Sequence, residues 1–212
     1  INIVPNSIPP SPSLVIDSGG NAVFPPGPPP SGTVASIWSG SIISAFANAS
    51  TVTVSTAVLG PGGASTGGTI YVDDVLALSG LTSSVSLRLQ AENKIVLNFG
   101  VIGPAFPGAV ELDLVAPSGV DWNGASISGA VQVSAKTAPS STSADGRISV
   151  SGASGGFQAT RLNTGSLVLS PGAEFQLGPN SSLQAGSLDL GASSKLFVGV
   201  SNFTYAGSIN ME

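Results

Sequence analysis

The C-terminal third of this sequence repeats at a constant interval, and this repeat limits the possible folds more than any other feature. The segment Gly165–Leu169 (Gly-Ser-Leu-Val-Leu) recurs as Gly186–Leu190 and again as Gly207–Met211, with the same 21-residue step both times. A single repeat of this length cannot bury its own apolar side chains, whereas stacked repeats share one continuous core. The repeat therefore predicts a β-solenoid, that is, a parallel β-helix with coils of about 20 residues.

The same interval is found upstream, with interruptions. It separates segment 108–112 from segment 129–133. Beyond Gly129 the phase is irregular, because the steps from Gly129 to Gly146 and from Gly146 to Gly165 are both shorter. We therefore expect the regular coils to be clearest in residues 108–212.

Apolar and polar residues alternate in short runs from residue 68 onward, as in 85–89 and 110–114. Short alternating runs separated by Gly, Pro, Ser and Asn are typical of strands joined by turns, so the predicted class is all-β. A β-sandwich or jelly roll explains the alternation equally well and remains the alternative. It gives no reason, however, for a constant phase in the repeat.

Residues 33–60 fit two local structures. Ile37, Trp38, Ile42 and Phe46 are spaced so that they could share one face of a helix, whereas 51–54 alternate like a strand.

The N-terminal segment 1–32 is rich in proline, which favours an extended chain and is excluded from helix interiors and central strands. We expect an extended arm over 1–32 and a single all-β domain over 33–212. We also expect the arm to dock on a neighbouring molecule by strand addition. The apolar residues proposed for this subunit contact are Ile1, Ile3, Val4, Leu14, Val15 and Ile16.

The composition excludes several classes of function. The chain has no Cys and no His, so it has no disulfides, no thiolate or imidazole metal ligands and no Ser-His-Asp triad. Its net charge of −5 argues against nucleic acid as a partner. The uncharged stretch 18–72 is interrupted by Ser and Gly, so we expect no membrane insertion. We expect no cofactor and no metal.

Carboxylates are the remaining acid–base groups. Glu111 and Asp113 share one face of a strand, as a pair of glycosidase carboxylates could. Asp73 and Asp74 are adjacent, so on a strand they would point to opposite faces. The six Lys and Arg residues are scattered along the chain rather than gathered around one groove. We therefore expect that the protein is not an enzyme.

Three Asn-x-Ser/Thr sequons, at Asn48, Asn180 and Asn202, are candidate glycosylation sites if the protein is secreted by a cell that glycosylates.

The Gly-Ser-Leu-x-Leu strands, the Ala/Gly/Ser-rich turns and the run Ser86–Ala91 resemble the repeats of filamentous-haemagglutinin-type surface proteins. That resemblance implies a right-handed parallel β-helix, secretion, and adhesion or fibre formation. The family's N-terminal secretion motif, of Asn-Pro-Asn type, has no counterpart here. The Pro-rich arm resembles instead the exchanged strand of donor-strand filament subunits.

These observations predict an extracellular or cell-surface structural protein that assembles with copies of itself into a filament, sheath or fibre. Assembly would proceed through the N-terminal arm or by end-to-end stacking. Because the chain starts at Ile1, we expect either a fragment or a product from which a signal peptide has been removed. The alternative function is a glycan- or host-binding adhesin segment, for which Trp38 and Trp122 are the candidate aromatic contacts.

Overall fold

The fold was analysed in a computed structural model, which describes residues 1–6, 15–17, 19–23, 36–56, 68–105, 109–151, 153–199, 203–205 and 209–211. Nearly all of these residues belong to strands and their turns, with one short helix, α1 (Ser39–Ala45). The prediction of an all-β protein is confirmed.

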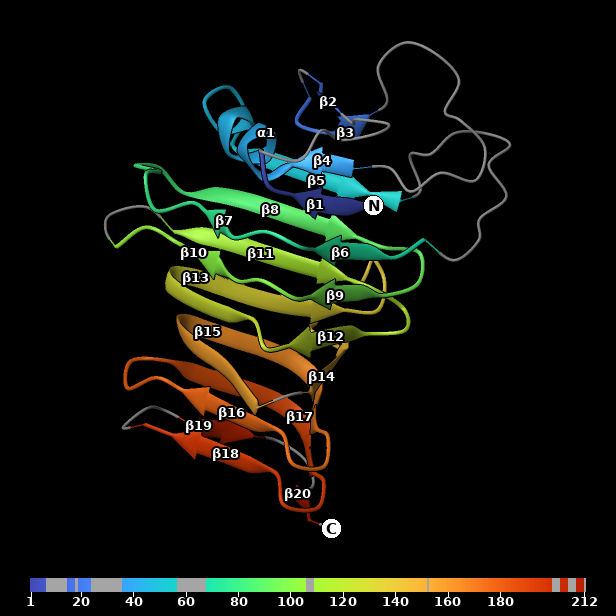
Figure 1. The fold of residues 1–212 in the computed structure, drawn as a ribbon, viewed down its shortest axis with the longest axis vertical. Coiled ribbons are helices and arrows are strands. Elements are labelled where there is room, and N and C mark those ends of the chain that lie inside the picture. Colours follow the sequence, from blue (N-terminus) through green and yellow to red (C-terminus); the bar gives the residue numbers. More distant parts are fainter. Residues whose placement is uncertain are drawn as a thin grey trace.

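The strands form one strongly curled, parallel sheet, in which segments that follow each other in sequence lie in three separate columns (Figure 1). In the first column the strands pair in the order β4 (Ser36–Trp38), β1 (Asn2–Val4), β6 (Ile70–Val72), β9 (Ile95–Leu97), β12 (Val120–Asn123) and β14 (Arg147–Ser151). The ends of β15 (Ala153–Leu169) and β17 (Ser182–Leu190) and then β20 (Ile209–Met211) continue it.

The second and third columns are built in the same way. The second contains β7 (Leu76–Ala77), β10 (Val101–Ile102), the start of β13 (Ser126–Lys136), the start of β15, β16 (Glu174–Leu177) and β18 (Lys195–Val198). The third contains β5 (Thr51–Ser55), β8 (Val85–Gln90), β11 (Val110–Val115), the end of β13, the middle of β15, the start of β17 and β19 (Phe203–Tyr205).

The chain visits the three columns in turn, so that each circuit adds one layer to the stack. This arrangement is compatible with the predicted solenoid. It does not fit the sandwich alternative, because sandwiches are built from antiparallel sheets. Among the described residues, the only antiparallel strand pair is β2 (Val15–Ile16) with β3 (Ala22–Val23).

The strand register confirms the C-terminal repeat as a structural unit. Leu167 pairs with Leu188, which in turn pairs with Ile209. Val110 pairs with Val131, as the upstream repeat predicts.

The N-terminal layers contain more residues per circuit than the C-terminal ones. Ile70, Ile95 and Val120 are successive register partners, and the interval between them exceeds the step from Leu167 to Leu188. The predicted coil of about 20 residues therefore describes the C-terminal layers and not the N-terminal ones.

The irregular phase beyond Gly129 has a structural cause, because Gly129 and Gly146 do not occupy equivalent positions in the stack. Gly129 pairs with Ala159, whereas Gly146 precedes β14 and lies beside Gly165 in the next layer. Residues 137–146, between β13 and β14, form an additional loop, which shifts the phase of the sequence without shifting the stack. The step from Gly146 to Gly165 is confirmed by the pairing of Arg147 with Ser166.

The repeated glycine lies at a corner where successive layers approach closely. A Cβ atom built on Gly186 would lie 2.6 Å from the carbonyl oxygen of Gly165, and one on Gly165 would lie 2.5 Å from that of Asp145. Any larger side chain would push the layers apart at this corner. This steric limit explains why the repeat keeps glycine.

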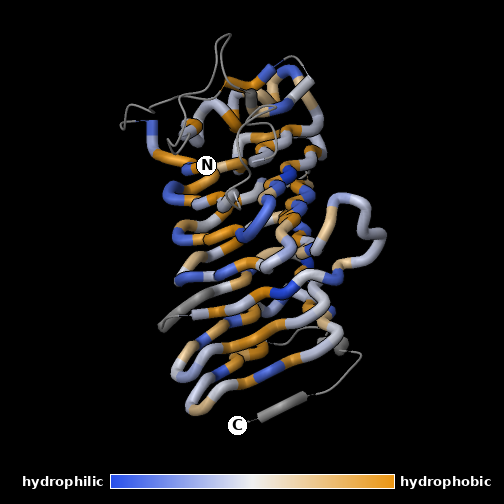
Figure 2. The backbone as a smooth tube through the Cα atoms, turned by 90° about the vertical axis from the view of Figure 1, so that its right-hand side faces the viewer, coloured by the Kyte–Doolittle hydropathy of each residue, from blue (hydrophilic) through white to orange (hydrophobic). Residues whose placement is uncertain are grey.

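The core runs through the middle of the stack, because alternate residues of every column point inward and stack on their counterparts in the next layer. Apolar segments recur in successive layers (Figure 2). The largest buried side chain, Trp122, packs edge-to-face against Phe175 and Phe157, with ring centroids 5.4 and 6.3 Å apart. Its indole N–H donates to the carbonyl oxygen of Ala125.

The N-terminal end of the stack departs from the order of the sequence. β1 lies between β4 and β6, although β2 and β3 separate it from β4 along the chain. Helix α1 packs against β2, β4 and β7 and buries Ile42. Ile37 and Trp38 lie on β4 and Phe46 follows the helix, so the expected helical face is divided between a strand and a short helix.

The two tryptophans allow a matched test of the core. We expect Trp122→Ala to lower the free energy of unfolding by about 3–5 kcal/mol, because it leaves a large cavity and removes two aromatic contacts. Trp38→Ala should cost much less, because Trp38 is 38% exposed. Urea denaturation of both variants measures the difference, and equal losses would contradict this description of the core.

Candidate functional site

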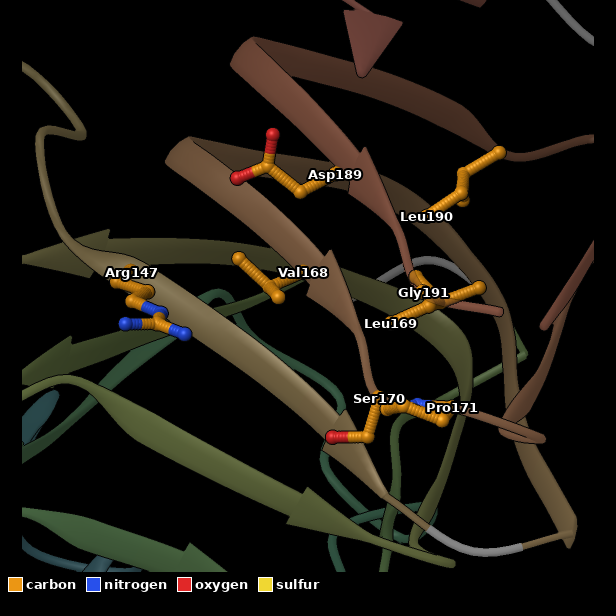
Figure 3. Close-up of a pocket in the computed structure, with 8 residues that line it drawn as sticks. All are labelled: Arg147, Val168, Leu169, Ser170, Pro171, Asp189, Leu190 and Gly191. Carbon is orange, nitrogen blue, oxygen red and sulfur yellow. The ribbon is translucent and has the colours of Figure 1, made fainter. Parts of the chain in front are cut away.

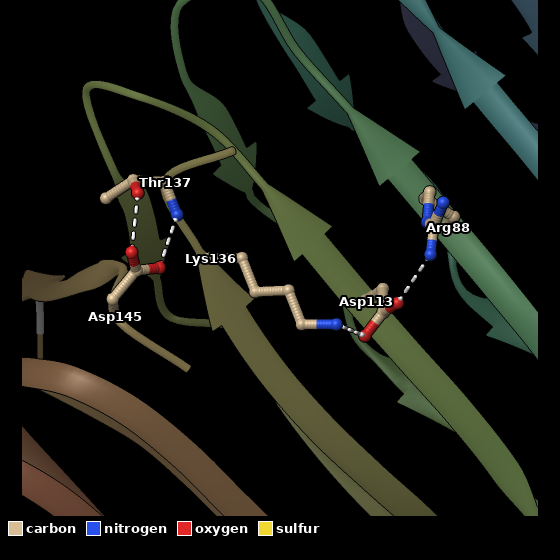
Figure 4. Close-up of polar contacts among 5 residues, drawn as sticks. All are labelled: Arg88, Asp113, Lys136, Thr137 and Asp145. Atoms are coloured by element: carbon tan, nitrogen blue, oxygen red, sulfur yellow. Dashed lines mark hydrogen bonds and ion pairs between the residues drawn. The ribbon is translucent and has the colours of Figure 1, made fainter. Parts of the chain in front are cut away.

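The outer face of the third column carries a charged cluster that spans three layers. Asp113 on β11 accepts hydrogen bonds from Arg88 on β8 (3.2 Å) and from Lys136 on β13 (3.1 Å), one on each carboxylate oxygen (Figure 4). Only 16% of the Asp113 side chain is exposed. The carboxylate therefore joins three neighbouring strands by their side chains.

This arrangement does not support acid–base chemistry at Glu111 and Asp113, the pair considered as glycosidase carboxylates. Both oxygens of Asp113 are engaged by cations, and Glu111 is an exposed neighbour on the same strand. The cluster has instead the geometry of a clamp between layers.

The other ion pairs of the described residues have the same geometry. Lys94 lies 2.8 Å from Asp121, and Lys195 lies 2.6 Å from Glu174. Both pairs join successive layers of the stack. These ion pairs, on three different columns, all run along the stacking direction.

Asp145 closes the neck of the loop between β13 and β14. It accepts hydrogen bonds from the backbone N–H of Thr137 (2.9 Å), from the Thr137 hydroxyl (2.8 Å) and from Ser141 (3.1 Å). The Thr137 backbone bond, followed by the Thr137 hydroxyl, lowers the pKa of Asp145 below its ordinary value of 3.8. The ionised carboxylate therefore holds the two ends of the loop together.

A row of polar side chains follows the first column where its strands end. The Asn98 amide donates to Asp73 (2.7 Å), and the Asn123 amide donates to Asn98 (3.0 Å). The partners in each bond are 25 positions apart, so one polar side chain comes from each layer. Asp74, next to Asp73, accepts a separate bond from Ser39 (2.5 Å).

A depression of about 590 Å³ lies over the C-terminal layers of the first column (Figure 3). Val168 of β15 lies between Arg147 of β14 and Asp189 of β17, and the turn residues Ser170 and Pro171 complete one side. It offers one cation and one carboxylate and has no second carboxylate for glycoside hydrolysis.

The six residues proposed for a subunit contact are divided by the structure. Val15 is exposed and Ile16 packs against the core, while Leu14 lies outside the described residues. The other three are buried in the sheet of their own chain: Ile1, Ile3 and Val4. Their contact with a second subunit stays a prediction, and it requires β1 to leave this position.

The expected glycosylation sites and aromatic contacts are only partly accessible. Asn48 and Asn180 lie in exposed turns, and Asn202 lies outside the described residues. Of the two tryptophans, Trp38 is exposed and Trp122 is fully buried, so Trp122 is wrong as a glycan contact. The sequence interpretation missed other aromatic side chains that are 40–49% exposed, namely Tyr71, Phe99 and Phe197.

Further properties can be stated for the described part of the chain. It contains no group of three or more acidic, His or Cys side chains placed to hold a metal ion. None of its helices has the length and hydrophobicity needed to span a bilayer. Comparison with protein-family models, curated proteins and solved structures finds no match.

The charged cluster yields a test of its structural role. We expect Asp113→Asn to lower the free energy of unfolding by about 1–2 kcal/mol, because two partly buried cations lose their common partner. Glu111→Gln, on the same strand, should change it by less than about 0.5 kcal/mol. Thermal denaturation at neutral pH measures both, and equal effects would contradict the clamp.

The neck of the loop should respond to acid. Because the pKa of Asp145 is lowered, its bonds to Thr137 are complete above pH 3.8 and are lost as the pH falls through the lower value. The NMR chemical shift of the Thr137 amide proton should stay constant until the pH approaches the lowered pKa of Asp145, and should change as the pH falls through it. In Asp145→Asn this titration should vanish, and its persistence would show that another group causes it.

Proposed function

We propose that this chain is a β-solenoid that serves as a structural subunit of an extracellular fibre or surface filament. The observation that carries the proposal is the continuous parallel stacking from β5 to β19, with one register shift in the β13–β15 pairing and ion pairs joining successive layers. Such a stack makes a stiff rod with few charges left to keep copies apart.

Assembly is proposed to occur by exchange of β1 between molecules. The N-terminal strand is held between β4 and β6 by pairing on both sides: the Ile1 and Ile3 carbonyls accept bonds from Tyr71 (2.8 Å) and Asp73 (2.9 Å). Chain connectivity does not fix its place, because the long segment to β4 separates it from both neighbours.

Exchange would preserve every contact that β1 makes. The same Ile3 side chain, 0% exposed, would fill the same site in a second copy, and the same backbone bonds would form. The free energies of the closed monomer and the strand-exchanged assembly therefore differ mainly by the entropy of association. End-to-end stacking is less favoured, because α1 lies at the N-terminal end of the stack, where it contacts β2, β4 and β7.

A disulfide test distinguishes exchange from intramolecular pairing, because the chain has no native cysteine. Asn2 and Ser36 are register partners on β1 and β4. In Asn2→Cys/Ser36→Cys, oxidation of assembled protein should give covalent dimers and longer ladders on a non-reducing gel. Negative-stain electron microscopy of the same sample should show filaments.

The matched control is Thr51→Cys/Ser86→Cys, which joins the register partners of β5 and β8 inside the stack. It should give only an intramolecular bond under the same conditions. If Asn2→Cys/Ser36→Cys also gives only cross-linked monomers and no filaments form, assembly by strand exchange is excluded.

A further inference from the structure

The first column has an exposed surface whose chemistry is not explained by assembly. We call it the amide row: Asp73, Asn98 and Asn123, one side chain from each of three successive layers. Each amide nitrogen carries two N–H groups, and the bond to the next layer uses one of them. The row can therefore offer further donors and acceptors to a hydroxyl-rich partner.

Exposed aromatic rings lie beside the amide row. Trp38 pairs in register with Val4, and Tyr71 lies two positions before Asp73 on β6. The exposed fractions of the two rings are 38% and 40%. Two strand spacings and a short offset along the strand separate them, which places their Cα atoms roughly 12 Å apart. Phe99, 49% exposed, directly follows Asn98.

The charge of this surface limits what it can attract. Asp73 ends the row, Asp74 lies next to it, and the cation Lys94 is paired with Asp121. An anionic chain would be repelled by the carboxylates, whereas a neutral hydroxylated chain would not.

We propose that this face of the first column binds a neutral polysaccharide that runs along the stack, with Trp38 and Tyr71 as stacking platforms and the amide row as the hydrogen-bonding contact. Aromatic faces stack on the C–H faces of sugar rings, and amide side chains pair with hydroxyls. This combination is found where sugars are recognised.

The spacing of the layers supports a polysaccharide that runs along the stacking direction. Successive layers are about 4.8 Å apart, which is close to the length of one pyranose ring in an extended chain. Each sugar unit would thus meet one layer, and one polar side chain of the row. The inference does not depend on fibre assembly, because every residue involved belongs to one molecule.

Affinity electrophoresis tests the proposal with hydroxyethyl cellulose, laminarin and galactomannan as neutral probes and heparin as the anionic one. The wild-type protein should be retarded in at least one neutral gel and not in the heparin gel. Trp38→Ala/Tyr71→Ala should weaken this binding at least about tenfold, because two stacking contacts are lost. Asn98→Ala, which interrupts the row, should weaken it as well.

The matched control is Phe197→Ala, which removes a more exposed ring (48%) from the second column and should bind like the wild type. Thermal denaturation checks that each variant is folded. Tyr71→Phe, which keeps the ring, should retain most of the binding. In the wild type, added polysaccharide should shift the emission of the exposed Trp38, since Trp122 is buried.

Retardation that is equal in the wild type and in Trp38→Ala/Tyr71→Ala would overturn the proposal. So would the lack of retardation in all three neutral gels, or a preference for heparin. Sedimentation at the concentration of the assay shows whether the protein is monomeric. A failure of strand exchange would leave these outcomes unchanged, so the two proposals can fail separately.

Discussion

The structure depends on one constraint: parallel backbones must stack in register at a single strand spacing, layer upon layer. Inward-facing residues then lie over their counterparts, which stacks Leu167 on Leu188. Residues of different columns meet across the core, as Trp122 does with Phe175. Successive layers approach closely at the corners, which excludes a side chain at Gly186. Charged residues must find partners in the next layer, as Asp113 does with Arg88 and Lys136.

Much of this fold follows from local patterns in the sequence. The constant phase of the C-terminal repeat predicted the register of Leu188 with Ile209, because identical coils place identical residues one above the other. The burial of Trp122 could also have been predicted, since it alternates with Val120 on β12. The position of β1 could not, because its pairing with β4 and β6 joins segments far apart in the sequence.

The candidate surfaces were less visible in the sequence, for a physical reason. Outward-facing residues are not constrained by packing, so their type gives little indication of their neighbours. The amide row did leave one signal, the equal spacing of Asp73, Asn98 and Asn123 along the chain. This spacing of 25 residues differs from the C-terminal period, because the N-terminal layers are longer. Assembly and polysaccharide binding are compatible proposals, since a stacked rod presents the same side chains repeatedly along its length.

Distances between paired spin labels test the stacking most directly. Ser86, Glu111, Gln132, Arg161 and Ser182 are successive register partners on the outer face of the third column. With one label at Ser182 and the other at Gln132, Glu111 or Ser86, the account predicts distances that grow by about 4.8 Å per layer, to roughly 19 Å between the Ser182 and Ser86 backbones. Distances that do not grow in equal steps along this series would contradict it.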